Sequence, residues 1–501
     1  MLWWSRWRFS GRPRVGRAAV GMASLCLAAA AGCMVGPYYH PPQPNMPTAW
    51  AGPTDQMTTS VEKQAALVNW WTTFQDPTLS ALVERAVKSN LDLRQAEARL
   101  QQARAAHGIA AAALWPTVNA TAAFTRSASP SASSGGGGAS SSSTGKPAVI
   151  AHSLFQAGLD ASWEMDLFGG VRRNLEAADA DVWAAVEDSR DVLVTLVAEV
   201  ALNYIDLRGS QQQIVIAQNN LVAQKHNADI TRQRFAAGLA SGLDVANADA
   251  QVATTAAQIP LLESSARQTI YSLSVLLGQA PATLLKELEP TSAIPPTPPE
   301  VPIVLPSELL RRRPDIRRAE AQIHAATARI GVATADLFPK FSLTASLSSQ
   351  SNRLGSVLDW VNRSWSFGPS AGWTLFDGGA ILSNIEVQKA IEEQVLITYQ
   401  KAILTALQDV ENALIAYTKE QENRKALTDA VTANRKALDL STKLYIEGQT
   451  DFLNVLIAER SLYNSEDALV QATRTVSTNL VALYKALGGG WDLPPQTEKT
   501  P

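Results

Sequence analysis

Four short stretches of this chain alternate apolar and polar residues with almost no errors, over residues 116–126, 154–167, 341–350 and 364–376. This period of two predicts β-strands with one apolar face. The opposite face carries small hydroxyl and acidic side chains. Strands that cross a membrane have this alternation over about 9–11 residues, with aromatic residues near the interfaces. We therefore predict that the aromatic residues on the apolar face contact lipid: Phe124, Phe155, Trp163, Phe341, Trp365, Phe367 and Trp373. A soluble antiparallel sheet with one buried face is the alternative interpretation.

The N-terminus carries several arginines before an apolar run over residues 18–31, which stops at Gly32-Cys33. This pattern is typical of a secretory signal. The small residues before Cys33 resemble a bacterial lipobox, so residues 1–32 are predicted to be a lipoprotein signal peptide and Cys33 the lipidated first residue of the mature chain. Cys26 would leave with the signal. A signal anchor with an incidental cysteine is the alternative, but the run is shorter than the roughly 18–20 residues of a spanning helix.

Composition limits the remaining functions. The 501 residues are 46% hydrophobic and 18% charged, with a formal net charge of −3, so nothing suggests a nucleic-acid partner. The mature chain has no apolar run of spanning length, so it could cross a bilayer only with strands. The five histidines are scattered, and no zinc signature or nucleophile elbow occurs. We expect no enzyme activity, no metal site and no cofactor other than the lipid on Cys33.

The chain is internally duplicated. Residues 90–124 match residues 313–347 without a gap, and a second match places Trp163 on Trp373. Each half is predicted to run helix, strand, loop, strand, long helix, turn, helix. The predicted organisation is an N-terminal extended and equatorial segment (33–75), a first repeat (76–290), a Pro-rich linker (291–306), a second repeat (307–490) and a tail (491–501). The proline-rich stretch from Pro281 to Pro306 is predicted not to be helical.

Long helices follow the second strand of each half. Their apolar stripes alternate spacings of four and three residues, as coiled-coil packing requires. No proline occurs from Val171 to Phe235, so an unbroken helix would be on the order of 90–100 Å long at about 1.5 Å per residue. A free-standing coiled coil or pore-free periplasmic scaffold is the alternative interpretation of these helices alone.

Four strands cannot close a barrel, and open strand edges are not tolerated in lipid. Several copies must therefore share one barrel. Three copies give twelve strands, which is an even number within the range of outer-membrane barrels. The helices of three copies would continue as a hollow cylinder, so the prediction is a trimeric channel.

Several motifs resemble the outer-membrane factors of tripartite efflux systems, the TolC-like proteins, and in particular their lipoprotein branch of the OprM and NodT type. The most specific are residues 33–38, 70–79, 163–169, 305–320 and 375–379. The resemblance implies a mainly α-helical trimer with a twelve-stranded β-barrel, a long periplasmic α-helical barrel and an equatorial belt. The family usually has an acidic residue where Tyr38 stands.

The same resemblance implies a function without chemistry. The chain would be the outer-membrane exit duct for drugs, solvents or metal ions, with a periplasmic adaptor protein and an inner-membrane pump of the resistance-nodulation-division type as partners. The outer component of a type I protein secretion system is the alternative within transport.

Gate and docking residues are also implied by the family, at the turns between the long helices. The gate candidates are Asp244, Asp451 and Asn454, and the loss of Asp244 or Asp451 is expected to loosen the tip. The adaptor-docking neighbourhood would include Arg234, Gly238, Tyr445 and Gly448. Helix capping is the alternative role for the acids and for Gly238 and Gly448. The abrupt turns from strand to helix are assigned to Gly169, Gly170, Gly378 and Gly379.

Overall fold

A computed structural model describes residues 34–52, 57–58, 67–130, 149–298, 301–302 and 305–491. The predicted signal peptide, Cys33 and residues 492–501 of the tail lie outside the described residues. The chain forms two compact units. The first, here the strand unit, comprises Met1–His40, Arg104–Asp181 and Ile323–Gln394. The second, here the helix unit, comprises Pro41–Ala103, Val182–Gln322 and Val395–Pro501.

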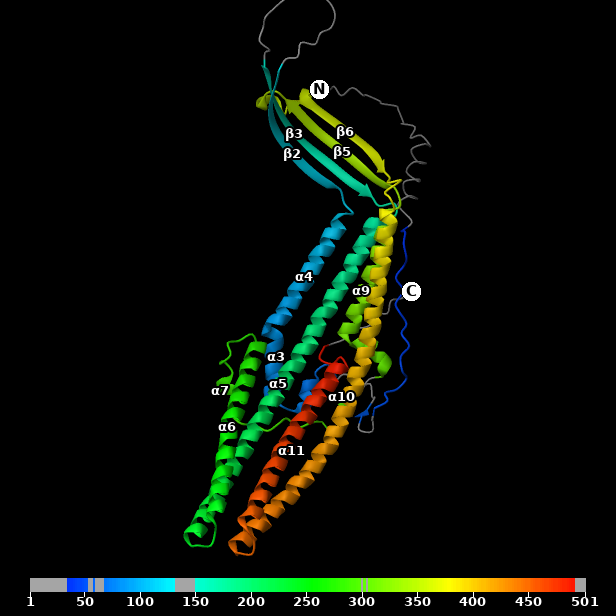
Figure 1. The fold of residues 1–501 in the computed structure, drawn as a ribbon. Helices are drawn as coiled ribbons and strands as arrows, with labels where there is room; N and C mark the ends of the chain where they lie inside the picture. Colours follow the sequence, from blue (N-terminus) through cyan, green and yellow to red (C-terminus); the bar gives the residue numbers. More distant parts are fainter. Residues whose placement is uncertain are drawn as a thin grey trace, which may run out of the picture. The chain divides into compact units, whose positions relative to one another are not determined.

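Three helices of the first repeat each have a counterpart of equal length in the second, and Figure 1 labels all six. The helices α4 (Leu91–Ala112) and α9 (Pro314–Ala335) have 22 residues each. The helices α5 (Gly170–Ala236) and α10 (Ala380–Ile446) have 67 residues each, and the helices α6 (Gly242–Leu276) and α11 (Phe452–Ala486) have 35. The duplication predicted from the sequence is therefore confirmed, as is the unbroken helix after the second strand.

Shorter elements complete the chain: η2 (Trp70–Phe74), α3 (Pro77–Ser89), α7 (Leu285–Leu288), η3 (Pro306–Glu308), α8 (Leu309–Arg312), η4 (Leu354–Ser356) and η5 (Trp360–Asn362). The strands β1 (Met57–Thr58) and β4 (Val301–Pro302) pair in parallel. The helix α7 contradicts the prediction that the stretch from Pro281 to Pro306 is not helical. Four residues without proline, between Pro281 and Pro290, are enough for one helical turn.

The strands β2 (Thr117–Pro130), β3 (Val149–Met165), β5 (Lys340–Ser351) and β6 (Arg363–Gly372) form one antiparallel sheet in the order β2-β3-β5-β6. The predicted strand positions are confirmed, with two differences at the ends. The first two strands extend further toward their connecting loop than the alternating pattern indicated. The last ends at Gly372 rather than at residue 376.

Both faces of this sheet are largely uncovered. On one face Leu347 pairs with Trp365, and Ala345 pairs with Phe367. Trp365 is 79% exposed and Phe367 66% exposed. The other face carries a ladder of serine pairs across β5 and β6, whose hydroxyl oxygens lie 2.7–2.8 Å apart: Ser342 with Ser370, Ser346 with Ser366, and Ser348 with Ser364. The interpretation as a soluble sheet with a buried apolar face is therefore wrong, and β2 and β6 are edge strands that pair on their outer side with no strand of the described residues.

Equivalent tryptophans join the sheet to the turn that follows the preceding helix in each repeat. The Trp163 indole Nε1–H donates to the Leu114 carbonyl at 2.9 Å, and the Trp373 indole donates to the Leu337 carbonyl at 3.0 Å. Trp163 is partly buried and Trp373 is 58% exposed, so neither lies in a dry interior. A tryptophan with an apolar ring and a satisfied N–H suits a position at a membrane interface.

The core of the helix unit forms around Trp70, whose ring stacks on Tyr484 with centroids 5.2 Å apart. Asp76 is the N-cap of α3 and accepts hydrogen bonds from the Thr78 and Leu79 backbone N–H groups at 2.8 and 3.0 Å. The other carboxylate oxygen accepts the hydroxyl of Tyr204 at 2.7 Å. One side chain thus caps a helix and ties it to α5.

Asp76→Ala should lower the free energy of unfolding by about 2–3 kcal/mol, because it removes a cap and leaves the buried Tyr204 hydroxyl without this acceptor. Tyr204→Phe removes only the hydroxyl and should cost about 1 kcal/mol. Thermal unfolding of the purified protein measures both. Equal losses for the two variants would mean that the cap contributes nothing.

Candidate functional site

The turns at the ends of α5 and α10 are built alike. Gly238 and Gly448 have positive φ angles of 75° and 74°. The Leu239 N–H donates to the Arg234 carbonyl, and the Gln449 N–H donates to the Leu444 carbonyl, each at 2.8 Å. This is the C-terminal cap that glycine makes at a helix end. Both glycines therefore have a structural role, and their predicted part in adaptor docking stays a prediction.

The predicted gate acids differ in what they do. Asp244 forms a capping box with Ser241: its carboxylate accepts the Ser241 N–H at 2.9 Å, and the Ser241 hydroxyl accepts the Asp244 N–H at 3.1 Å. Asp451 is the N-cap of α11 but makes no capping side-chain bond. Asn454 donates through its amide to the Thr450 hydroxyl at 2.7 Å. Asp244 therefore caps α6, which is the alternative role stated above, and Asp451 is the acid without such a task.

Arg234 and Tyr445 join the two helical hairpins near these turns. The Arg234 guanidinium lies 4.7 Å from the centre of the Tyr445 ring and donates to the Ile446 carbonyl at 2.9 Å. Tyr445 also donates its hydroxyl to Thr231 at 3.5 Å and packs in a buried cluster with Phe452. We call these contacts the hairpin latch. Tyr445 is only 6% exposed, and its predicted place in the adaptor-docking neighbourhood stays a prediction.

Above the latch the helix core is unusually polar. On α5 the buried Gln224 has no hydrogen-bond partner among the described residues. Asn227, one turn further, donates to the carboxylate of the buried Glu459 on α11. Arg460 donates to Gln251 of α6 at 2.8 Å. These polar side chains lie among buried apolar ones such as Ala228 and Val455, so hydrogen bonds and apolar packing together hold this segment.

The sequence analysis missed this polar segment, although the sequence carries a signal for it. Asn220, Gln224, Asn227 and Thr231 repeat at spacings of four and three residues, as core positions of a coiled coil do, one position before those at which the apolar stripe of α5 continues with Leu221. Polar residues at such positions lower stability and fix register in coiled coils.

Burial raises the pKa of Glu459 above its ordinary value of 4.5, and the Asn227 hydrogen bond opposes this only in part. The folded protein therefore keeps this proton to higher pH than the unfolded chain. The contribution of Glu459 to stability is most favourable below pH 4.5 and declines as the pH rises through the folded-state pKa.

Glu459→Gln should therefore raise the unfolding temperature at pH 8 and flatten its fall between pH 5 and pH 8, because the amide keeps an oxygen for Asn227 and has no charge to bury. Glu466→Gln is the matched control, since it removes a carboxylate that pairs with Arg435 at 2.7 Å. That control should not stabilise the protein at pH 8. An unchanged pH profile in Glu459→Gln would contradict this assignment.

The chain directly after Cys33 is held tightly within the strand unit. The Val35 N–H donates to the Phe168 carbonyl at 3.1 Å, and the fully buried Arg173 donates to the Val35 carbonyl at 3.1 Å. The Arg173 guanidinium lies 4.6 Å from the centre of the Tyr38 ring. Tyr38 thus offers its π face to an arginine at the position where the related family usually has an acid.

The strand-to-helix turns use aspartates as well as glycines. Asp166 accepts the N–H groups of Val171 and Arg172 at the start of α5, at 3.2 and 2.9 Å. Asp377 accepts those of Gly379 and Ile381 at the start of α10, both at 2.8 Å. The predicted turn glycines Gly169, Gly378 and Gly379 have φ angles of 81°, 67° and 92°. Gly170 does not have a positive φ, and a Cβ there would lie 3.0 Å from the Ala335 Cβ, so it provides space for packing.

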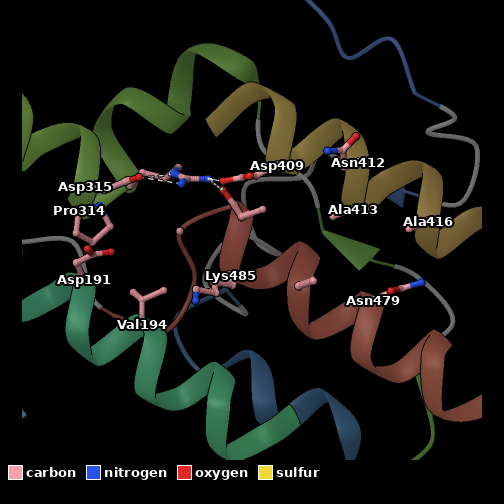
Figure 2. A pocket seen from close by; sticks show the side chains of 14 residues that line it. Asp191, Val194, Pro314, Asp315, Asp409, Asn412, Ala413, Ala416, Asn479 and Lys485 are labelled. Carbon is pink, nitrogen blue, oxygen red and sulfur yellow. Dashed lines mark hydrogen bonds and ion pairs between the residues drawn. The ribbon is translucent and has the colours of Figure 1, made fainter. Parts of the chain in front are cut away.

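A polar cavity of about 480 Å³ lies within the helix unit (Figure 2). Arg313 binds both carboxylate oxygens of Asp315 at 3.1 and 2.8 Å, and it donates to Asp409 of α10 at 3.1 Å. It also donates to the Ala486 carbonyl at the end of α11, at 3.2 Å. Burial lowers the pKa of Arg313, but Asp315 and Asp409 together outweigh this effect and raise the pKa above its ordinary value, so Arg313 remains charged. The Arg-Pro-Asp motif therefore clamps the start of α9 to α10 and α11.

The predicted lipid-facing residues divide into two groups. Phe124, Trp365, Phe367 and Trp373 are 58–79% exposed, whereas Phe155, Trp163 and Phe341 are partly buried. Phe124 and Phe155 are cross-strand partners with ring centroids 4.6 Å apart. This pair continues the apolar face across β2 and β3.

Within the described ranges no cluster of three or more His, Cys, Asp or Glu side chains is placed to hold a metal ion. None of the helices in that part of the chain combines the length and the apolar character needed to span a bilayer.

The described sheet has an uncovered apolar face and two open edges, and it is joined to helices of 67 residues. This combination defines a class of membrane-inserted channel proteins. The family model described as outer membrane efflux protein matches residues 82–279 and 305–489. The chain belongs to this family. The family and the fold are those of channels, and the protein is an efflux channel of the outer membrane with long periplasmic helices.

Relatives of known name cover nearly the whole chain. It is 31% identical over 461 residues to nodulation protein T of Rhizobium leguminosarum bv. trifolii, a match covering 92% of this chain and 95% of that protein. It is 36% identical over 425 residues to the pyoverdine export outer membrane protein OpmQ of Pseudomonas aeruginosa, covering 84% and 87%.

Solved channels have the same fold. The outer-membrane channel OprN superposes with a TM-score of 0.82 at 37% identity, covering 92% of this chain and 100% of that one. The open state of the Neisseria gonorrhoeae MtrE channel superposes with a TM-score of 0.77 at 29% identity, covering 93% and 100%.

Proposed function

We propose that three copies of this chain pair their open strand edges into one twelve-stranded barrel and form the exit duct of a tripartite efflux pump. The observation that carries the proposal is the uncovered sheet, with its exposed apolar face and its unpaired edges at β2 and β6. In lipid an unpaired edge costs several kcal/mol per polar group, so closure requires further copies. A heterologous contact repeated around a three-fold axis closes on itself.

Small molecules are the proposed cargo, delivered by a periplasmic adaptor and an inner-membrane pump of the resistance-nodulation-division type. The names of two relatives support this class: OpmQ is named for pyoverdine export, and TtgC of Pseudomonas putida for toluene efflux. The serine ladder of β5 and β6, with Asp160 and Glu164 of β3 opposite Ser346 and Ser342, would line a wet, polar lumen that admits chemically varied solutes.

Native mass spectrometry in detergent and planar-bilayer recording together test the proposal. We expect three chains per particle and ion currents that increase in Asp451→Ala, the gate candidate without a capping task. A monodisperse monomer without current in either form would contradict the proposal.

Cys33 is proposed to carry the lipid, with no other bound group. The supporting observation is the position of the next residue: a Cβ on Gly169 would lie 2.5 Å from the Met34 Cγ, so Met34 lies near the turn that follows β3. An acyl chain there would enter the membrane at the level where the strand ends.

Incorporation of labelled palmitate in the producing cell tests this assignment. It should be lost in Cys33→Ser and kept in Cys26→Ser, because Cys26 belongs to the predicted signal. Label that persists in Cys33→Ser would place the lipid elsewhere.

A further inference from the structure

The loop between β5 and β6 displays large apolar side chains outward. Leu354, Leu358, Trp360 and Val361 are 71%, 76%, 82% and 87% exposed. Four such residues within eight positions form an apolar patch in a connection that usually carries polar residues. The sequence analysis did not identify this patch, because it has neither the period of a strand nor that of a helix.

The loop is nonetheless a folded element, because several of its polar groups form hydrogen bonds with one another. The Ser349 hydroxyl donates to the carbonyls of Val357 and Asn362, and the Asn362 amide donates to the Ser356 carbonyl at 2.8 Å. Val357 is buried at 7% exposure. With its hydrogen bonds turned inward, the loop forms a folded element that presents an apolar surface.

Two arginines lie at the edges of this patch. Arg363 places its guanidinium 4.7 Å from the centre of the Trp360 ring and donates to the Leu358 carbonyl at 3.2 Å. Arg353 is exposed at the start of η4. With Asp359 between them, the loop has a net charge of +1. Tryptophan and arginine side by side are characteristic of the level of the lipid head groups.

The length of β5 places the loop at that level. Twelve residues at about 3.3 Å each, tilted by about 40°, span roughly 30 Å along the membrane normal. The apolar band of an outer-membrane barrel is about 25 Å tall. The helix α9 leads into β5, and β6 leads into α10, so both helices join the same end of this strand pair. The loop between the two strands is at the other end and emerges at the outer leaflet.

We infer that residues 354–361 insert into the outer leaflet and that Arg353 and Arg363 bind the phosphate groups of its lipids. The occupant is thus the lipid surface itself, in contact with a loop that would otherwise be assigned to the aqueous exterior. Burying the four side chains removes their apolar surface from water, and each arginine adds about 1 kcal/mol near an anionic surface.

A spin label tests this placement in the full-length protein reconstituted in phosphatidylcholine vesicles. Val361→Cys carries the label at the patch, and Gly108→Cys carries it on α4, where a Cβ meets nothing within 4 Å. Unsubstituted protein corrects for labelling of the native cysteines. The ratio of collision with oxygen to collision with a water-soluble nickel complex should be several-fold higher at position 361 than at position 108.

Equal ratios at the two positions would overturn the inference, because the loop would then lie in water. A label at position 361 that is shielded from both reagents would also overturn it, because the loop would then pack against another copy.

Arg363→Gln tests the head-group contact. Adding a lipid with a phosphate monoester to the vesicles should raise the ratio at position 361 in the arginine form and leave it unchanged in Arg363→Gln. The same increase in both forms would show that Arg363 does not bind the phosphate.

Discussion

Arg234→Ala is expected to increase the open probability of the channel by at least about a hundredfold. The substitution removes the hydrogen bond to the Ile446 carbonyl and the cation–π contact with Tyr445 from the hairpin latch. Together these contribute about 1–2 kcal/mol in one chain. If three tips open together, the loss is about 3–6 kcal/mol, which gives this shift in the ratio of open to closed channels. Recording from single channels in a planar bilayer measures it directly.

Arg232→Ala is the matched control, two residues away. Arg232 pairs with Asp229 and Asp249, and therefore bonds only within the hairpin of α5 and α6. Its loss leaves the latch intact and should leave the open probability close to that of the unchanged protein. If both variants opened the channel equally, the effect would come from general loosening of the hairpin and the latch would have no special role.

Gly36→Ala is expected to lower the stability of the protein more than the addition of a methyl group at any other glycine of the strand unit. Gly36 has a φ of 88°, and an added Cβ would lie 2.5 Å from the Gly331 Cα. The unfavourable backbone angle costs about 1–3 kcal/mol and the overlap a similar amount, because a backbone atom cannot move aside as a side chain could. The segment that follows Cys33 would then leave its position on Arg173. We expect a markedly lower unfolding temperature and poor recovery of the protein from the outer membrane.

Gly108→Ala provides the comparison for this substitution. Gly108 is in α4, where an added Cβ meets no atom within 4 Å. Alanine in a helix interior is favoured over glycine by about 1 kcal/mol, so this variant should be at least as stable as the unchanged protein. Similar recovery of both variants would show that the contact between Gly36 and Gly331 is unimportant.

The period of the apolar residues explains why so much of the fold could be predicted. Each strand of the sheet has one apolar face, and an error of one residue would have placed Trp365 and Phe367 on the face of the serine ladder. The long helices α5 and α10 contain no proline, and both end where Gly238 and Gly448 provide a C-terminal cap. These are local signals, which a single sequence contains.

Contacts between distant residues could not be predicted in the same way. The sequence places Tyr445 near a helix end but does not show that it is buried against Arg234 and Thr231 of another helix. Tyr38 stands where the family usually has an acidic residue, and the sequence alone does not show that its ring lies against the guanidinium of Arg173. Neither pairing leaves a periodic pattern in the sequence.

The polar stripe on α5 was visible in the sequence but was not recognised. Gln224 and Asn227 lie one position away from the apolar stripe, so a search for apolar residues at heptad spacing does not detect them. Their function depends on a partner such as Glu459, more than two hundred residues further along the chain.

Crosslinking between the two edge strands tests the central claim most directly. Thr121 on β2 and Ser364 on β6 lie in one row across the sheet, through Gly158 and Ser348. Three strand spacings, about 14 Å, separate them within one chain, so a bismaleimide shorter than this cannot join them there. With Thr121→Cys and Ser364→Cys in the same chain, the membrane-inserted protein should give crosslinked dimers and trimers and nothing larger. Either single variant should give neither product. A double variant that stays monomeric, or a ladder that continues beyond three chains, would contradict a barrel closed by three copies.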